Sequence, residues 1–147
     1  MPKTHPGIVA KSDLSFELSY IGYNTFSIEQ ILFLMKAVSP DFIQINGNIY
    51  LLSNFNGYSH DDENRFDNTP QGKERYINNI SLSDLFYFSE DLKSHEPETQ
   101  KKIGSYILEF WKMRLYYLFP DKKFDFIVSE NGLFDESGIC ITFSQIS

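Results

Sequence analysis

The stretch FIQINGNIYLL, residues 42–52, carries the clearest structural signal in this sequence. Its Asn46-Gly47 pair lies between two apolar runs, and both residues tolerate the positive φ angles of a two-residue type I′ turn. Such a turn joins two antiparallel strands and fixes the register in which they pair. The stretch therefore predicts a β-hairpin.

Upstream of this hairpin, the sequence predicts a leader, a strand and a helix. Residues 1–12 hold two prolines and a glycine, which favours a flexible leader. Apolar and polar residues alternate over 14–20, which predicts a strand with one buried face. Ser27 and Gln30 have the spacing of a helix capping box, and apolar residues at helical spacing follow as far as Pro40.

Downstream, we expect a long loop, two helices and a closing hairpin. Residues 56–79 are mostly polar and indicate a loop with a short helix near 73–77. Ser81 or Ser83 can cap a next helix, and Pro97 suits the first turn of a longer one over 98–119. Alternation at 124–128 and 139–143 predicts the last hairpin. The apolar residues of the capped helix are Leu82, Leu85, Phe86 and Leu92.

Together these elements predict an α+β protein with the order β-α-β-β-α-α-β-β. We expect one domain over residues 13–147, built as an antiparallel sheet of about five strands with helices packed on one face. The chain has 14 Phe and 9 Tyr, so large aromatic side chains must fill much of its core.

Acidic residues outnumber basic ones and gather in two segments. The net charge is −7; residues 12–64 carry seven acids against one base, and residues 124–147 carry four acids and no base. Nucleic-acid binding needs clustered Lys and Arg to neutralise phosphates, so this charge disfavours it. The distribution favours a basic protein partner, with solubility alone as the alternative.

The sequence offers few residues for catalysis or metal binding. Cys140 is the single cysteine, so no internal disulfide is expected. His5, His60 and His95 have no ligand at a spacing that metals favour, and we expect no metal and no cofactor. A small enzyme that pairs Cys140 with His60 or His95 is the alternative. No apolar run approaches the roughly 20 residues that span a bilayer, and we expect no membrane partner and a cytoplasmic location.

Two segments supply the candidate partner-binding residues. The acidic segment 60–67 lacks the central glycine and the distal glutamate of a calcium loop, so a metal-binding loop is the least favoured of three alternatives, the others being a partner-facing loop and a merely solvated one. Segment 130–136 combines carboxylates with two apolar residues that are either anchors for a partner or part of the core. The candidates are Tyr58, Asp61, Asp62, Glu63, Phe66, Asp67, Glu130, Leu133, Phe134, Asp135 and Glu136.

The chain resembles the immunity proteins that bacteria keep beside polymorphic toxins, particularly those of contact-dependent growth inhibition systems. The resemblance lies in the size, the low pI, the lack of catalytic residues, and the aromatic helix segment FWKMRL (110–115) that passes through Phe119-Pro120 into FDFIV (124–128). It implies a protein that binds and blocks a basic toxin domain, often a nuclease. Because the sequence shows no recognisable active site, we expect that the protein is not an enzyme, and we expect a monomer in isolation or a weak dimer. A structural or adaptor subunit is a further alternative.

Overall fold

The structure is a computed structural model, and it describes residues 27–59 and 62–146. The predicted leader (1–12) and first strand (14–20), together with His60 and Asp61, lie outside the described residues. The chain divides into two compact units, residues 1–35 and 36–147. No helix in the described ranges is long and apolar enough to cross a membrane.

Helix α2 (Ile28–Val38) begins at the predicted capping box. The backbone N–H of Gln30 donates to the Ser27 hydroxyl at 3.1 Å, and the N–H of Ser27 donates to the Gln30 side-chain oxygen at 3.0 Å. Each side chain thus satisfies a backbone donor that the first helical turn leaves without an intrahelical acceptor. The predicted start of this helix is confirmed.

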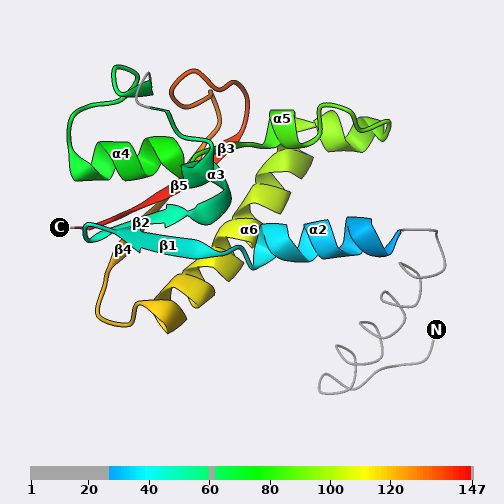
Figure 1. Cartoon of the computed structure of the whole chain (residues 1–147). Helices are drawn as coiled ribbons and strands as arrows, with labels where there is room; N and C mark the ends of the chain where they lie inside the picture. Colours follow the sequence, from blue (N-terminus) through cyan, green and yellow to red (C-terminus); the bar gives the residue numbers. More distant parts are fainter. Residues whose placement is uncertain (1–26, 60–61, 147) are drawn as a thin grey trace. The chain divides into compact units, whose positions relative to one another are not determined.

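Strands β1 (Phe42–Ile45) and β2 (Asn48–Leu51) form the predicted hairpin (Figure 1). Ile45 pairs with Asn48, so the turn consists of Asn46 at φ 50° and Gly47 at φ 85°. Both residues adopt the left-handed conformation that a type I′ turn demands. The tight turn therefore sets the register of the whole hairpin.

Gly47→Ala should lower the free energy of unfolding by about 1 kcal/mol, because an L-residue with a Cβ pays to adopt a left-handed conformation. A Cβ built at Gly47 meets nothing within 4 Å, so conformation alone sets this cost. Gly57→Ala is the matched control: Gly57 has φ −89°, and alanine there should be neutral or slightly stabilising. Urea denaturation measures both, and equal effects would contradict this account of the turn.

A second sheet has the strand order β3-β5-β4, with both pairings antiparallel. Strands β4 (Phe124–Ser129) and β5 (Cys140–Gln145) form the predicted closing hairpin, in a register that runs from Phe124↔Gln145 to Ser129↔Cys140. Strand β3 (Ile80–Ser81) is a short addition beside β5 that the sequence did not predict.

Helices are present near 73–77, after Ser81 and over most of 98–119 as predicted, but the second of them is much shorter than expected. Thr69 caps α4 (Pro70–Ile77), and Ser81 caps α5 (Leu82–Leu85), which ends after four residues. Leu85 and Leu92 are consequently 51% and 82% exposed, so their predicted place in a buried helix face is wrong. The remaining helices are α3 (Leu52–Asn56), the 3₁₀ helix η2 (Leu92–His95) and α6 (Pro97–Leu118), which has Pro97 in its first turn as predicted.

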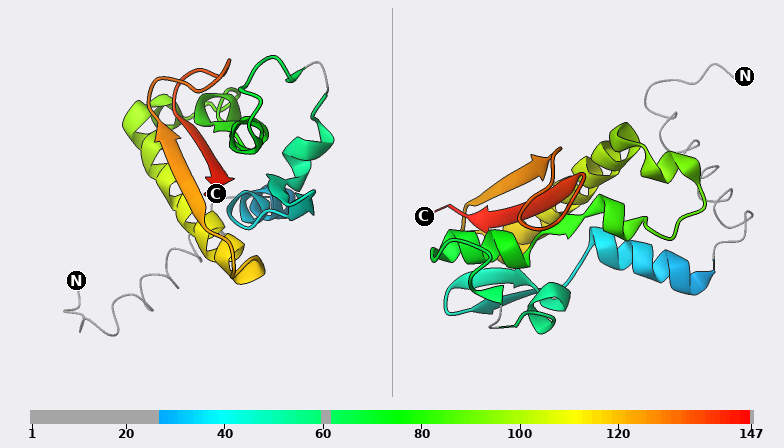
Figure 2. Two further views of the ribbon diagram at one scale, coloured as in Figure 1. Left: turned by 90° about the vertical axis from the view of Figure 1, so that its left-hand side faces the viewer. Right: turned by 90° about the horizontal axis from the view of Figure 1, so that it is seen from above.

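The core lies where α6 packs against β5. Trp111 and Leu115 of α6 are at most 1% exposed, and they share a cluster with Ile141 and Phe143 of β5. Because alternate residues of a strand point to opposite faces, Thr142 and Ser144 face the other way, where they bond to Arg75 of α4. Helices α6 and α4 therefore cover opposite faces of β5 (Figure 2), and the prediction of helices on one face is wrong.

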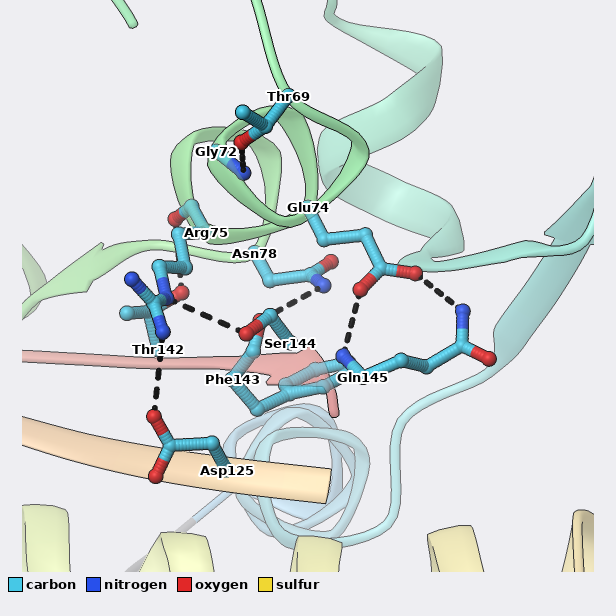
Figure 3. Close-up of polar contacts among 10 residues, drawn as sticks. All are labelled: Thr69, Gly72, Glu74, Arg75, Asn78, Asp125, Thr142, Phe143, Ser144 and Gln145. Atoms are coloured by element: carbon cyan, nitrogen blue, oxygen red, sulfur yellow. Dashed lines mark hydrogen bonds and ion pairs between the residues drawn. The ribbon is translucent and has the colours of Figure 1, made fainter. Parts of the chain in front are cut away.

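The predicted five-stranded sheet is also wrong, because Glu74 of α4 and Asn78, the residue at its C-cap, bond to both β2 and β5 where backbone pairing was expected. Figure 3 shows the bonds that these two side chains make to β5. Glu74 accepts the N–H groups of Ile49 at 2.8 Å and Gln145 at 2.6 Å. Asn78 accepts the N–H of Leu51 at 2.8 Å and donates to the carbonyl groups of Ile49 and Phe143. Over residues 27–59 and 62–146 there are thus two sheets, of two and three strands, joined through Glu74 and Asn78.

Helical geometry explains how side chains replace a strand here. Four residues along a helix rise about 6 Å, and two residues along a strand rise about 6.6 Å. Glu74 on α4 and Asn78 at its C-cap, four residues apart, therefore match Ile49 and Leu51, two apart on β2. Both side chains are at most 1% exposed, so their bonds form away from solvent.

Candidate functional site: a pocket between two acidic segments

Aromatic contacts bring the two predicted segments together at α4. Tyr76 of α4 lies between Phe66, at a ring-centroid distance of 5.0 Å, and Phe134, which meets it edge-on at 5.2 Å. Tyr58 extends the series, 6.5 Å from Phe66. Phe134 holds its ring against Tyr76 from a backbone with φ 57°, a conformation that bulky residues rarely adopt. The segments 58–67 and 130–136, distant in sequence, thus form one site.

Arg65 makes a polar link between the same segments. Its guanidinium lies 3.6 Å from a carboxylate oxygen of Asp62 and 3.6 Å from one of Asp135. A hydrogen bond with Tyr76 and the charges of these carboxylates raise the pKa of Arg65. Both ion pairs are longer than a good N–H···O hydrogen bond, so this guanidinium holds the two carboxylates loosely.

A pocket of about 230 Å³ opens between these groups. Clefts that hold drug-sized ligands span roughly 300–1,000 Å³, so this one suits a single side chain better than a cofactor. Its lining combines aromatic rings, carboxylates and amides: Asn54, Gly57, Tyr58, Asp62, Arg65, Tyr76, Ile77, Asn79, Phe134, Asp135 and Glu136.

Asn79 is one of the amide residues that line the pocket. Its side-chain nitrogen donates to the carbonyl oxygen of Leu133 at 3.4 Å, and its backbone carbonyl accepts a bond from Asn54 at 3.2 Å. The side-chain oxygen of Asn79 has less than 1 Å² exposed, and among the described residues it has no hydrogen-bond partner. Because less than 1 Å² of it is exposed, this oxygen is not accessible from the pocket, and the same side-chain amide also forms a hydrogen bond with the Cys140 thiol.

Negative charge gathers at the mouth of the pocket. A hydrogen bond that the protonated Glu136 carboxyl donates to the neighbouring carboxylate of Asp84 raises the pKa of Glu136, and burial and the charges of Asp84 and Asp135 add to this shift. A raised carboxyl pKa indicates that like charges crowd this position. A cation placed there would relieve their repulsion.

The predicted site residues fall into three groups. Five of them line the pocket: Tyr58, Asp62, Phe134, Asp135 and Glu136. Glu63 and Phe66, with Tyr58, line an adjoining hollow that includes Lys73.

The remaining predicted residues hold the structure together or lie outside it. Asp67 accepts bonds from the Thr69 backbone and hydroxyl beside the start of α4, and these bonds lower its pKa. Glu130 forms an ion pair with Lys101 of α6. Leu133 exchanges backbone bonds with Glu136 in a tight turn. Asp61 lies outside the described residues.

Sequence reasoning missed Arg65, Tyr76 and Asn79. Tyr76 is the single aromatic residue of α4, in a helix whose mean hydropathy is low, and that contrast was the available signal. Arg65 and Asn79 give no such signal, because only the fold brings them to the pocket. The missed surface also includes Tyr87 and Phe88, which are 70% and 90% exposed after α5.

Cys140 and His95 are engaged in ways unlike a nucleophile and its base. Cys140 is fully buried, and burial raises the pKa of its thiol, whereas a cysteine nucleophile needs a lowered one. The His95 ring bonds to the backbone oxygen of Ser89 at 2.8 Å. Within the described ranges, no three His, Cys, Asp or Glu side chains gather closely enough to hold a metal ion.

Comparison with known proteins identified no relative of the chain. No protein-family model, curated protein or solved structure matches the chain. The geometry and charge of the pocket are therefore the observations that bear on function.

Proposed function

We propose that the chain is a toxin-neutralising protein that binds and blocks a basic toxin domain, as the immunity proteins it resembles do. The convergence of the two acidic segments on one pocket is the observation that supports this most. Segment 58–67 and segment 130–136 meet through Tyr76 and through the Arg65–Asp135 ion pair. A partner that approaches this face meets both segments at once.

The site combines the two features that protein interfaces use for fast and lasting association. Carboxylates at its rim would steer a basic surface toward it and speed encounter. The partly exposed rings of Tyr58 and Phe134 offer flat, rigid anchors at its centre, and such anchors slow dissociation. This pairing fits a binding protein with a cationic partner.

Co-expression with the product of the neighbouring gene, followed by affinity capture, tests the function directly. The proposal expects that product to be toxic alone, to be neutralised by this chain and to be captured with it. A neighbour that is neither toxic nor bound would contradict the proposal.

Charge reversal tests the surface. Changing Asp61, Asp62 and Glu63 together to Lys should slow association with the partner more than it quickens dissociation, because steering acts on the on-rate. Loop charges contribute little to folding, typically under about 0.5 kcal/mol each, so the fold should survive. The slowing should fade at high salt, since the Debye length falls from about 10 Å at 0.1 M to about 3 Å at 1 M.

A matched variant separates this local effect from net charge. Glu90, Glu98 and Glu109 are exposed and lie outside both segments, so changing them together to Lys alters the charge equally. Stopped-flow association at several salt concentrations should show the larger slowing for the 61–63 variant. If both variants slowed association equally, or neither slowed it, the interface would not lie at this pocket.

A further inference from the structure

The pairing of β4 with β5 fixes which backbone groups of β4 point away from the sheet. The N–H of Ile146 donates to the carbonyl oxygen of Lys123 at 2.9 Å, so these two residues are a hydrogen-bonded pair next to the first pair of the ladder. Hydrogen-bonded and non-hydrogen-bonded pairs alternate along two antiparallel strands. Every second residue of β4 therefore turns its N–H and C=O groups away from β5. These residues are Phe124, Phe126 and Val128.

The outward groups of β4 have no partner in the part of the chain that the structure describes. Strand β4 is the outer strand of the order β3-β5-β4 (Figure 2), and no hydrogen bond between described residues uses these N–H or C=O groups. The opposite edge of β5, by contrast, has partners in β3, Asn78 and Glu74. Strand β4 thus offers three pairing positions in a row to another strand.

The sequence of β4 lacks the usual protections of an edge strand. Natural edges are commonly blocked by lysine, proline or a bulge, and FDFIVS (124–129) has none of these in its continuous register. Its single charged residue is Asp125, whose carboxylate lies 3.2 Å from the guanidinium of Arg75. Phe126 and Ile127 are half-buried and Val128 is 37% exposed, so an added strand would also cover apolar surface.

The open positions are complementary to a second copy of themselves. Phe126 is the middle one, so an antiparallel copy related by a two-fold axis at Phe126 sets Phe124 of each strand opposite Val128 of the other. Each of the three pairs can then exchange two N–H···O bonds, about six in all. The same register sets the basic Lys122 of one strand beside the acidic Glu130 of the other, whereas a parallel copy would set lysine beside lysine.

We propose that two copies of this chain associate through their β4 edges, antiparallel about a two-fold axis at Phe126, and so form one continuous sheet. The contact consists mainly of one pair of strands, which is less than the roughly 1,600 Å² of a standard interface. The dimer therefore dissociates in the micromolar range or above. The inference goes beyond the proposed function and does not depend on it, because it concerns the chain alone.

Sedimentation equilibrium and residue-resolved amide hydrogen exchange of the full chain test the inference together. As the concentration rises through the micromolar range, the monomer should give way to a dimer. The three outward amides should then exchange about tenfold more slowly, because pairing protects them in the dimer alone. The alternate amides bond to β5 in both states and should not respond, so they are an internal control. These control residues are Asp125, Ile127 and Ser129.

Two variants at one position test the strand pairing itself. Val128→Pro removes an outward N–H and keeps the bonds to β5, since proline is tolerated on an edge strand whose N–H faces solvent. The dimer loses two bonds in this way, and its dissociation constant should rise about tenfold or more. Val128→Ala truncates the same side chain but keeps the N–H, so it should weaken the dimer less. Circular dichroism of each variant checks that it is folded.

Several results would each overturn the inference. One is a monomer up to millimolar concentration, and another is a dimer whose outward amides stay unprotected. Outward amides already protected in the monomer would mean that another segment of the chain covers the edge. Protection that appears only with the co-expressed neighbour would assign the edge to that protein instead of a second copy. Equal dissociation constants for Val128→Pro and Val128→Ala would show that the N–H of Val128 makes no bond across the interface.

Discussion

Replacing Glu74 with leucine is expected to lower the free energy of unfolding by about 3–5 kcal/mol. The carboxylate is 1% exposed and accepts the backbone N–H groups of Ile49 and Gln145. Leucine fills much of the same space, keeps water out and accepts no bond. Each N–H group left without an acceptor costs about 1–3 kcal/mol, and the two sheets lose the hydrogen bonds by which Glu74 connects them.

Urea denaturation of three variants tests this expectation. The free energy of unfolding of Glu74→Gln should lie between those of wild type and Glu74→Leu. An amide oxygen can still accept the N–H of Ile49, but the amide nitrogen then faces the N–H of Gln145 and cannot accept it. Glu109→Leu makes the same change at an exposed position of α6 and should stay within about 0.5 kcal/mol of wild type. If Glu74→Leu were as stable as Glu109→Leu, Glu74 would not join the sheets.

Replacing Trp111 with alanine should lower the free energy of unfolding by about 3–5 kcal/mol, the range for truncating a large buried aromatic residue. Trp111 is 1% exposed and meets Phe42 and Phe143 edge-on, with ring centroids 6.5 and 6.0 Å away. Its indole N–H also donates to the carbonyl oxygen of Ala37 at 2.8 Å. The variant would lose partner binding only through unfolding, because Trp111 is not among the residues that line the pocket.

Tyr117→Ala supplies the control in the same helix. Tyr117 is 84% exposed, so its truncation leaves no cavity and should change the free energy of unfolding by less than about 0.5 kcal/mol. Thermal and urea unfolding of both variants measure the difference. Similar losses for Trp111 and Tyr117 would contradict the placement of the core between α6 and β5.

Local signals predicted most of the elements correctly. Asn46-Gly47 specifies its turn through backbone conformation, and Ser27 and Gln30 specify a helix start through short-range bonds. The grouping of strands failed because Glu74 and Asn78 act on partners 25 to 71 residues away. In sequence, Glu74 reads as an ordinary surface residue of a charged helix. Nothing local indicates that it is buried or that it bonds to β2.

The sequence indicated which segments form the candidate site, but not which of their residues line the pocket. Charge and aromatic content selected both segments, and five of the selected residues line one pocket. Asp67 and Glu130 look the same as those five in sequence, yet Asp67 bonds to Thr69 and Glu130 to Lys101. Which carboxylate supports the fold and which faces the pocket depends on tertiary neighbours that periodicity does not reveal.

The way in which α4 joins the two sheets also bears on aggregation. A strand edge with open N–H and C=O groups is a template on which another chain can add a strand. Glu74 and Asn78 occupy such groups on Ile49, Leu51, Phe143 and Gln145. Detachment of α4 would therefore bare two edges at once, in a chain rich in Ile, Phe and Tyr. We therefore expect α4 to hinder strand pairing between molecules as well as to connect the two sheets.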